Sequence, residues 1–414
     1  MKRVLLLLAV MLGVGIGAAQ TTITYWQYDY ATRVDAMNQL IAQFEAANPD
    51  IKVVQETFPY DGYQQQVAAS MPAGQGADVA QLFYGWLPTW QRAGYVVPLP
   101  EQFFDAAELD ANFAPLAQAA KVDGTWYGLP TAVRSLALFY NADMLASAGY
   151  DAPPATWDEF VEIAEALTVK QGARFTQVGY GFAPTGQDHH LVREVLIRQF
   201  GGAPYSDDYS TVTYDSEAGV EALTFYTDWV TKYGFAVPEF VPGNNGYRDG
   251  FRQLENIAMI VDGSFAIGDV KKVSFNWGVT ELPVFDNGIK SNFGSFFMNA
   301  ITPNATKDPA KLEAAAKFLK FVTSDDAMKL WLDVVGELPA SRSLIADPTL
   351  AADPVYGPFV RALDYAHATV FVDETGQRDV MVDAINEVVL QGTSPAVAIK
   401  EAAAAEQLLL DANR

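Results

Sequence analysis

Residues 22–58, TITYWQYDYATRVDAMNQLIAQFEAANPDIKVVQETF, contain the strand and helix signals that decide the fold. Residues 22–26 alternate in polarity and are rich in β-branched and aromatic side chains, which predicts a strand. A helix that ends at Asn48-Pro49 is then predicted by one apolar stripe, formed by Val34, Met37, Leu40, Ile41 and Phe44. Residues 51–58 again have the composition of a strand.

The same alternation continues along the chain. Residues 64–70 are expected to be helical, and residues 78–83 form a third predicted strand that runs into the loop Tyr84-Gly85-Trp86. Strand, helix, strand, helix, strand is the order of a parallel, doubly wound sheet with helices on both faces. The sequence therefore predicts an α/β fold.

Later helices carry clear signals at their starts. Thr156-Trp157-Asp158-Glu159 has the pattern of a capping box, and Ser394-Pro395 puts proline at the first position of a final helix. Trp157, in the capping box, and Trp331, on an amphipathic stripe, are expected to be structural. At about 150 residues per domain, 414 residues correspond to two or three domains.

Three Leu-Pro pairs each precede an apparent change of element: Leu129-Pro130, Leu282-Pro283 and Leu338-Pro339. Proline fixes φ and biases the preceding residue to extended geometry, which suits strands that cross between two lobes. The alternative is that 22 prolines in 414 residues produce such pairs by chance.

The composition excludes several classes of protein. With 27 basic and 50 acidic residues, the net charge is −23, which repels nucleic acid and anionic membrane surfaces. The chain has no cysteine, which rules out disulfides, cysteine-bound metals and a thiol nucleophile. The three histidines, His189, His190 and His367, do not have a helical metal-binding spacing. We expect no metal and no cofactor.

The N-terminus has the features of a secretory signal peptide. Lys2 and Arg3 precede an apolar run over residues 4–17, and Gly17-Ala18-Ala19 supplies small residues for cleavage. The run is shorter than the ~20 residues of a membrane anchor. Cleavage after Ala19 leaves 25 basic and 50 acidic residues, and the absence of cysteine predicts that no lipid anchor is attached. We expect a soluble, exported product.

Several segments, in order along the chain, resemble the extracytoplasmic solute-binding proteins of ABC sugar importers, the group related to maltose-binding protein. They include ITYWQYDY with LIAQFEAANPDIKV, ADVAQLFYGWLPTWQRAGYVVPL, VDGTWYGLPTAVRSLALFYNADML, PPATWDEFVEIAEAL, IAMIVDGSFAIG, ELPVFDNG and KFLKFVTSDDAMKLWLDVVGELPASRSLI. Two departures from the family pattern are Phe293-Gly294, in place of Gly-Gly, and Leu254-Glu255-Asn256, in place of a turn containing glycine.

The resemblance implies the two-lobed periplasmic-binding-protein fold, with lobe one at residues 20–130 and 284–337 and lobe two at residues 131–283 and 338–414. Hinges are then expected near Pro130, Pro283 and Pro339. It also implies a periplasmic, monomeric receptor that captures a mono- or oligosaccharide between its lobes and delivers it to the permease subunits of an ABC importer. Clefts between domains are common small-molecule sites, and sugars need flat aromatic faces and planar hydrogen-bonding groups.

The sequence itself indicates several ligand-binding candidates. Trp26 ends the first predicted strand, and Tyr84 and Trp86 follow the third, so they are expected at carboxyl ends of strands, where ligands bind. The alternative for each tryptophan is a core position. Arg134 lies between apolar neighbours beyond Pro130, so it needs a partner, either the ligand or a structural carboxylate.

Further candidates lie in the second lobe. Tyr180 and Phe182 alternate on a predicted strand that leads into residues 184–188, a loop expected to reach towards the cleft. Asp188-His189-His190 is expected to be part of a surface loop rather than a metal or catalytic site. The resemblance alone adds seven candidates, Tyr247, Asp262, Ser264, Phe265, Trp277, Phe293 and Arg342.

Two other functions compete with this interpretation. A secreted carbohydrate-active enzyme needs only two carboxylates, and the chain has 50, but no acid and nucleophile segment is recognisable. A receptor of the same fold for a non-sugar solute is the second alternative. Few histidines argue against soft metals, and an amino-acid ligand favours more charge in the cleft.

Overall fold

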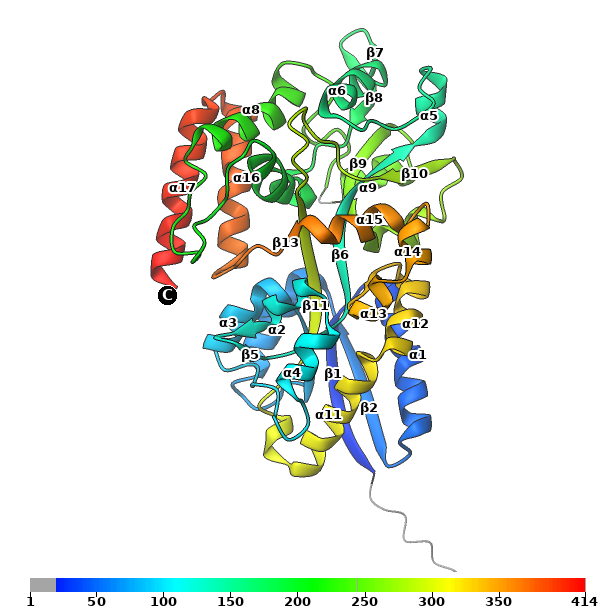
Figure 1. Cartoon of the computed structure of the whole chain (residues 1–414), viewed down its shortest axis with the longest axis vertical. Helices are drawn as coiled ribbons and strands as arrows, with labels where there is room; N and C mark the ends of the chain where they lie inside the picture. The colour runs from blue at the N-terminus through cyan, green and yellow to red at the C-terminus, as the bar shows by residue number, and fades with distance from the viewer. Residues whose placement is uncertain (1–19, 244, 414) are drawn as a thin grey trace, which may run out of the picture.

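The computed structural model describes residues 20–243 and 245–413, so the proposed signal peptide lies outside the described residues. Figure 1 shows two lobes, one above the other, connected by long strands. The main sheet has the strand order β2-β1-β3-β11-β6-β9-β8-β7 and continues through both lobes. Within the described residues, none of the helices has the length and apolarity needed to cross a membrane.

The lower lobe contains the parallel part of the sheet predicted from residues 22–83. β1 (Thr21–Tyr28) lies between β2 (Ile51–Phe58) and β3 (Val79–Phe83) and pairs with both in parallel. This confirms the three predicted strands. The connecting helices are α1 (Ala31–Ala47) and α2 (Tyr60–Ser70), and α11 (Pro309–Val322) and α12 (Asp325–Val335) pack beside α1. The predicted apolar stripe of α1 is buried at Met37, Leu40, Ile41 and Phe44.

The upper lobe is built on β9 (Ile257–Gly263), β8 (Arg174–Tyr180), β7 (Val169–Gln171) and β10 (Trp277–Thr280). Its helices are α5 (Ala142–Ser147), α6 (Trp157–Ala166), α8 (Glu217–Thr231), α9 (Gly246–Arg252) and α10 (Ile267–Val270). The capping box of α6 is confirmed, because the side chain of Thr156 accepts from the Glu159 N–H and the side chain of Glu159 accepts from the Thr156 N–H. Trp157 is fully buried, as expected for a structural residue.

Two long antiparallel strands cross between the lobes, β6 (Leu129–Asn141) and β11 (Asn292–Ile301). Leu129-Pro130 opens β6, and Leu338-Pro339 forms β12, which pairs with Val133 and Ala132 of β6. Leu282-Pro283 does not begin a crossing strand. The following residue, Val284, remains bonded to the start of α6, because its carbonyl accepts from the Trp157 N–H, and the chain crosses later, in β11.

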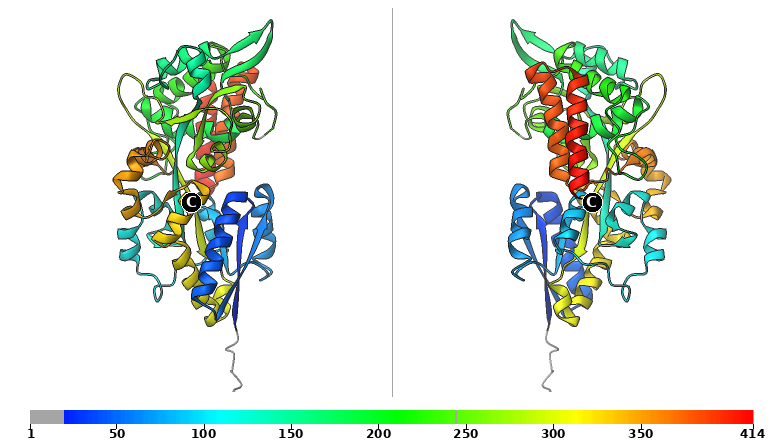
Figure 2. Two further views of the ribbon diagram at one scale, coloured as in Figure 1. Left: turned by 90° about the vertical axis from the view of Figure 1, so that its right-hand side faces the viewer. Right: turned by 90° about the vertical axis from the view of Figure 1, so that its left-hand side faces the viewer.

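The chain finishes on the upper lobe after α13 (Arg342–Ile345), α14 (Pro348–Ala352) and α15 (Gly357–Ala362). The last helices, α16 (Glu374–Gln391) and α17 (Pro395–Ala412), pack against each other and against α8, and both views of Figure 2 show them beside the upper lobe. Arg193 fixes α17 through a buried ion pair with Glu406, 2.9 Å long. The Glu406 carboxylate also accepts from Tyr205, Tyr214 and Gln377, so every hydrogen-bonding direction of this buried charge is used.

Candidate ligand site between the lobes

A buried cluster of charges lies beside the crossing strands. Arg33 is in the first turn of α1, Arg134 lies in β6, and Glu337 follows Gly336, whose φ of +88° ends α12 in a left-handed turn. Nη2 of Arg33 donates to Oε1 of Glu337 at 2.5 Å, and Nε of Arg134 lies 3.9 Å from the same oxygen. The other oxygen of Glu337 accepts from Nε1 of Trp331 at 2.8 Å.

Burial and charge act against each other in this cluster. Burial lowers the pKa of Arg33 to about 10 and also lowers the pKa of Arg134, while Glu337 opposes both shifts. Burial acts to raise the pKa of Glu337, but the charges of Arg33 and Arg134 outweigh it and hold that pKa below its ordinary value. The two arginines therefore share one ionised carboxylate.

Aromatic rings from both lobes surround these guanidinium groups. Phe265 of the upper lobe, in the short helix η5 (Ser264–Ala266) after β9, has Cζ of Arg134, Arg248 and Arg33 at 5.1, 5.2 and 5.9 Å from its ring centroid. Phe297 of β11 has Arg134 at 4.8 Å and Arg33 at 4.9 Å. These distances are those of cation–π contacts. We call the group that they connect the interlobe assembly: Arg33, Arg134, Arg248, Phe265 and Phe297.

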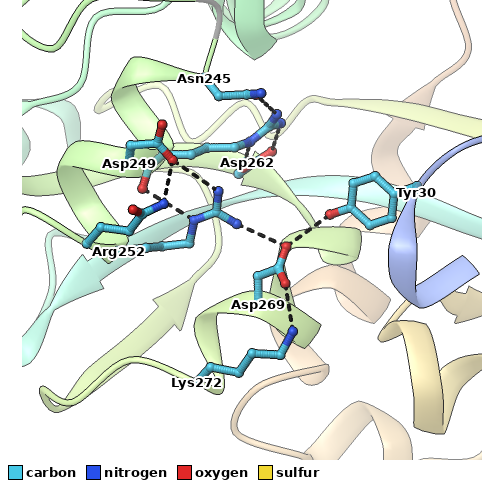
Figure 3. Close-up of polar contacts among 9 residues, drawn as sticks. Tyr30, Asn245, Asp249, Arg252, Asp262, Asp269 and Lys272 are labelled. Atoms are coloured by element: carbon cyan, nitrogen blue, oxygen red, sulfur yellow. Dashed lines mark hydrogen bonds and ion pairs between the residues drawn. The ribbon is translucent and has the colours of Figure 1, made fainter. Parts of the chain in front are cut away.

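A second pair of charges extends the assembly into the upper lobe. Arg248 of α9 holds the fully buried Asp262 of β9 through two hydrogen bonds, from Nε at 2.6 Å and from Nη2 at 2.8 Å. Asn245 accepts from the third nitrogen of Arg248 at 3.0 Å. Figure 3 shows this network beside Arg252, Asp269 and Lys272. The bidentate geometry fixes the plane of the Arg248 guanidinium against Phe265.

Tyr30 connects the two lobes at the edge of this network. It lies just before α1 in the lower lobe, and its hydroxyl donates to Oδ2 of Asp269 in α10, at 3.3 Å (Figure 3). Asp269 also accepts from Arg252 at 3.1 Å and from Lys272 at 3.0 Å. The carboxylate of Asp269 is therefore oriented by the upper lobe and is contacted by the lower lobe.

Trp86 makes another polar contact between the lobes. It lies in η1 (Tyr84–Trp86), and its indole Nε1 donates to Oε2 of Glu374, the first residue of α16, at 3.3 Å. Burial raises the pKa of Glu374 above its ordinary value. Tyr60 packs on Trp86 at 5.8 Å between ring centroids and remains 45% exposed. Solvent therefore reaches the aromatic assembly at Tyr60.

The structure brings together some of the candidates that the sequence indicated. Trp86, Arg134 and Phe265 lie in the interlobe assembly, and Asp262 and Tyr247 join it through Arg248, which lies 4.9 Å from the Tyr247 ring. Tyr84 stacks on Phe296 at 4.9 Å and contacts Phe371 at 5.8 Å. It lines a separate groove of about 450 Å³ together with residues 115–122 and 366–371.

Other candidates lie apart from the assembly. Trp26 packs edge-on to Phe58, and Trp277 stacks on Phe139 at the edge of the upper sheet. Tyr180 is fully buried in the core of the upper lobe, and Phe182 stacks on Tyr226. Phe293 is stacked on His190, and Ser264 is fully buried, with no hydrogen-bond partner for its hydroxyl among the described residues. Arg342 is exposed and lines a hollow of about 650 Å³ between α4 (Ala106–Asn112), α12 and α13.

The prediction of a surface loop at Asp188-His189-His190 is wrong. All three residues are buried: Asp188 ends the helical turn η3 (Pro184–Asp188), and the two histidines lie between it and η4 (Leu191–Leu196). The Asp188 carboxylate accepts from the hydroxyls of Tyr180 and Tyr226 at 2.6 and 2.5 Å, which compensates its burial. Burial raises the pKa of Asp188 to about 6 and lowers that of His189 to about 3. The described residues hold no group of three or more His, Asp or Glu arranged to bind a metal ion.

The sequence interpretation missed Arg33, Glu337, Phe297, Arg248 and Glu374. One signal was present for Arg33, because it lies on the same face of α1 as Met37 and Leu40, and a charge on an apolar face requires a buried partner. Glu337 lies between a glycine and a Leu-Pro pair, with nothing in the local pattern to indicate a partner more than 300 residues away. Its role depends on tertiary structure alone.

Comparisons with known proteins agree with this architecture. Residues 39–358 match the family model of the bacterial extracellular solute-binding proteins. A maltotriose-binding protein of Pyrococcus abyssi is 24% identical over 347 residues, which cover 83% of this chain and 72% of that protein. An arabinooligosaccharide-binding protein of Halalkalibacterium halodurans is 24% identical over 349 residues, with 80% and 74% of the two chains covered.

Solved structures with similar folds extend over nearly the whole chain. An ABC transporter solute-binding protein from Thermotoga lettingae, bound to α-D-tagatose, has a TM-score of 0.81 at 25% identity, covering 94% of this chain and 100% of the other. The GacH receptor of Streptomyces glaucescens has a TM-score of 0.83 at 22% identity, covering 95% and 100%. The predicted α/β, two-lobed fold is thereby confirmed.

Proposed function

The chain belongs to the bacterial extracellular solute-binding proteins, and we propose that it captures a carbohydrate between its two lobes and delivers it to the permease of an ABC importer. The family and the names of the relatives support this function. The observation that carries it here is the meeting of aromatic faces and planar charged groups, from both lobes, around Arg134 and Phe265. A sugar presents a C–H face to aromatic rings and hydroxyls to such groups.

Closure of the lobes is the second part of the proposal. We assign residues 20–130 and 284–337 to lobe one and residues 131–283 and 338–414 to lobe two, in a monomer, with one change: residues 284–291 stay with lobe two, because Val284 is bonded to the start of α6. Contacts of Tyr30 with Asp269 and of Trp86 with Glu374 join groups on opposite lobes, so they are made when the lobes are close together. A ligand that touches both lobes favours the closed state, because only differential contact shifts an equilibrium.

In this proposal the protein binds and releases the ligand without altering it chemically. Two buried carboxylates of the interlobe assembly, Glu337 and Asp262, are both held by arginines in ion pairs, an arrangement that suits orientation rather than proton transfer. Incubation with glycans followed by chromatography is the test, since turnover of any glycan contradicts a receptor without catalytic activity.

Export with cleavage after Ala19 is also proposed, from the sequence features of residues 2–19. Intact mass of the protein from the extracytoplasmic fraction is expected to begin at Gln20. A product of that fraction that retains residues 1–19 contradicts the assignment.

The binding proposal is tested by thermal unfolding with a panel of mono- and oligosaccharides, followed by calorimetric titration of those that raise the melting temperature. At least one glycan is expected to stabilise the protein in a concentration-dependent way. If amino acids or peptides stabilise the protein and no glycan does, the ligand is a non-sugar solute and the carbohydrate proposal is wrong.

A further inference from the structure

We propose that the carbohydrate held between the lobes carries an acidic group, such as the carboxylate of a uronic acid, and that Arg134 binds this group; the inference rests on the carbohydrate proposal above. It names a chemical class of ligand that the fold alone does not define. The charges around Phe265 point to this class.

Arg134 lacks the partner that a buried arginine normally has. The residue is only 9% exposed, yet its side chain donates no hydrogen bond to any residue of the described chain, and its Nε is buried without a partner. The nearest carboxylate, Glu337, is 3.9 Å away and already accepts from Arg33 and Trp331. Burying a charged group without direct hydrogen bonds is unfavourable, so such a group is expected to find its partner in the ligand.

The balance of charge around Phe265 is positive. Three guanidinium groups lie within 5.9 Å of this ring, those of Arg33, Arg134 and Arg248. Two carboxylates neutralise them, and both are occupied, Glu337 by Arg33 and Asp262 by two hydrogen bonds from Arg248. A third carboxylate, Glu374, accepts from Trp86 and interacts with the charge of Arg378 instead. The positive charge left over belongs to Arg134.

The surroundings of Arg134 leave its donors free for an anion. Its aromatic neighbours, Phe297 at 4.8 Å and Phe265 at 5.1 Å, stabilise the cation without accepting its N–H groups in ordinary hydrogen bonds. A carboxylate matches the planar fork of a guanidinium with two parallel hydrogen bonds and also cancels its charge. The hydroxyls of a neutral sugar accept the hydrogen bonds but leave the charge in place.

The test compares matched glycans on the full chain. Calorimetric titrations use mono- to tetrasaccharides containing glucuronate or galacturonate, together with their neutral glucose and galactose counterparts, at constant ionic strength. We expect the best acidic glycan to bind at least about tenfold more tightly than its neutral counterpart, because hydrogen bonds between charged groups are roughly twice as strong as neutral ones.

Variants of Arg134 show whether this residue is responsible for the preference. Arg134→Gln is expected to reduce it to about twofold or less and to leave the melting temperature without ligand unchanged or higher, because an uncompensated buried charge is removed. Arg134→Lys keeps the charge without the fork, so it is expected to retain part of the preference. The control, Arg361→Gln, alters an arginine paired with Glu281 at the surface and is expected to change neither quantity.

Three results would overturn the inference. Neutral glycans that bind as tightly as acidic ones contradict it while leaving the carbohydrate proposal intact. A lower melting temperature for Arg134→Gln, with equal losses of affinity for acidic and neutral glycans, assigns Arg134 to structure alone. If no glycan of either kind binds, the carbohydrate proposal fails and the inference fails with it.

Discussion

Replacement of Glu337 by glutamine tests the buried charge cluster. Glu337 is 5% exposed, and its loss leaves Arg33, which is 1% exposed, without its ion pair. Breaking a buried pair by removing one partner costs about 3–5 kcal/mol, because the remaining charge stays buried. We therefore expect Glu337→Gln to lower the free energy of unfolding at pH 7 by about this amount in urea titrations followed by circular dichroism.

The pH dependence of the same variant provides an independent check. The pKa of Glu337 lies below its ordinary value in the folded protein, so its stabilisation is fully present above the unfolded value and is lost as the pH falls through the folded value. The difference between wild type and Glu337→Gln is thus expected to shrink on acidification below about pH 4. Glu313→Gln, which removes a surface partner of Lys317, is the control and is expected to have almost no effect. A loss of less than about 1 kcal/mol for Glu337→Gln refutes the description of the cluster as a buried, strongly coupled pair.

Three further variants test other parts of the structure. Tyr30→Phe removes the hydroxyl that contacts Asp269, and stopped-flow measurements are expected to show ligand dissociation about two- to fivefold faster; an unchanged rate contradicts a role in closure. Arg342→Gln is expected to leave affinity unchanged, since Arg342 lies in a hollow away from the interlobe assembly, and a tenfold loss by titration would reverse that view. The pKa of Asp188 is raised to about 6, so the stability that this group contributes is lost as the pH rises through that value. Asp188→Asn is therefore expected to flatten the dependence of the free energy of unfolding on pH between about pH 4 and 6. An unaltered pH dependence counts against the raised pKa.

Local patterns predicted the elements that depend on local interactions. The alternation in residues 22–26, the apolar stripe of α1 and the capping box at Thr156 each involve residues within one or two turns of one another, and all three are present in the structure. Leu129-Pro130 also marks a crossing strand, and Leu338-Pro339 pairs with that strand. The third does not, because the residue after Pro283 bonds to the start of α6, a contact that no local pattern encodes.

Assignments that depend on distant partners were less predictable. The polar residues at 188–190 predicted a loop, but the hydroxyls of Tyr180 and Tyr226 compensate the buried Asp188, and His190 stacks on Phe293 of the distant strand β11. Among the candidates, Trp86 lies in the interlobe assembly because it follows the end of β3, and Arg134 because β6 crosses between the lobes. Tyr180 and Trp277 have the same aromatic character but face the upper core and the sheet edge. Residue type alone does not separate these cases.

A crystal structure of the protein with its tightest-binding glycan would show where the sugar lies. We expect electron density for the sugar between the lobes, with one of its groups bonded to the guanidinium of Arg134 and its ring against Phe265 or the Tyr60–Trp86 pair. Density confined to the groove beside Tyr84, which residues of both lobes line, or to the hollow beside Arg342, with no contact between the sugar and Arg134, would contradict it.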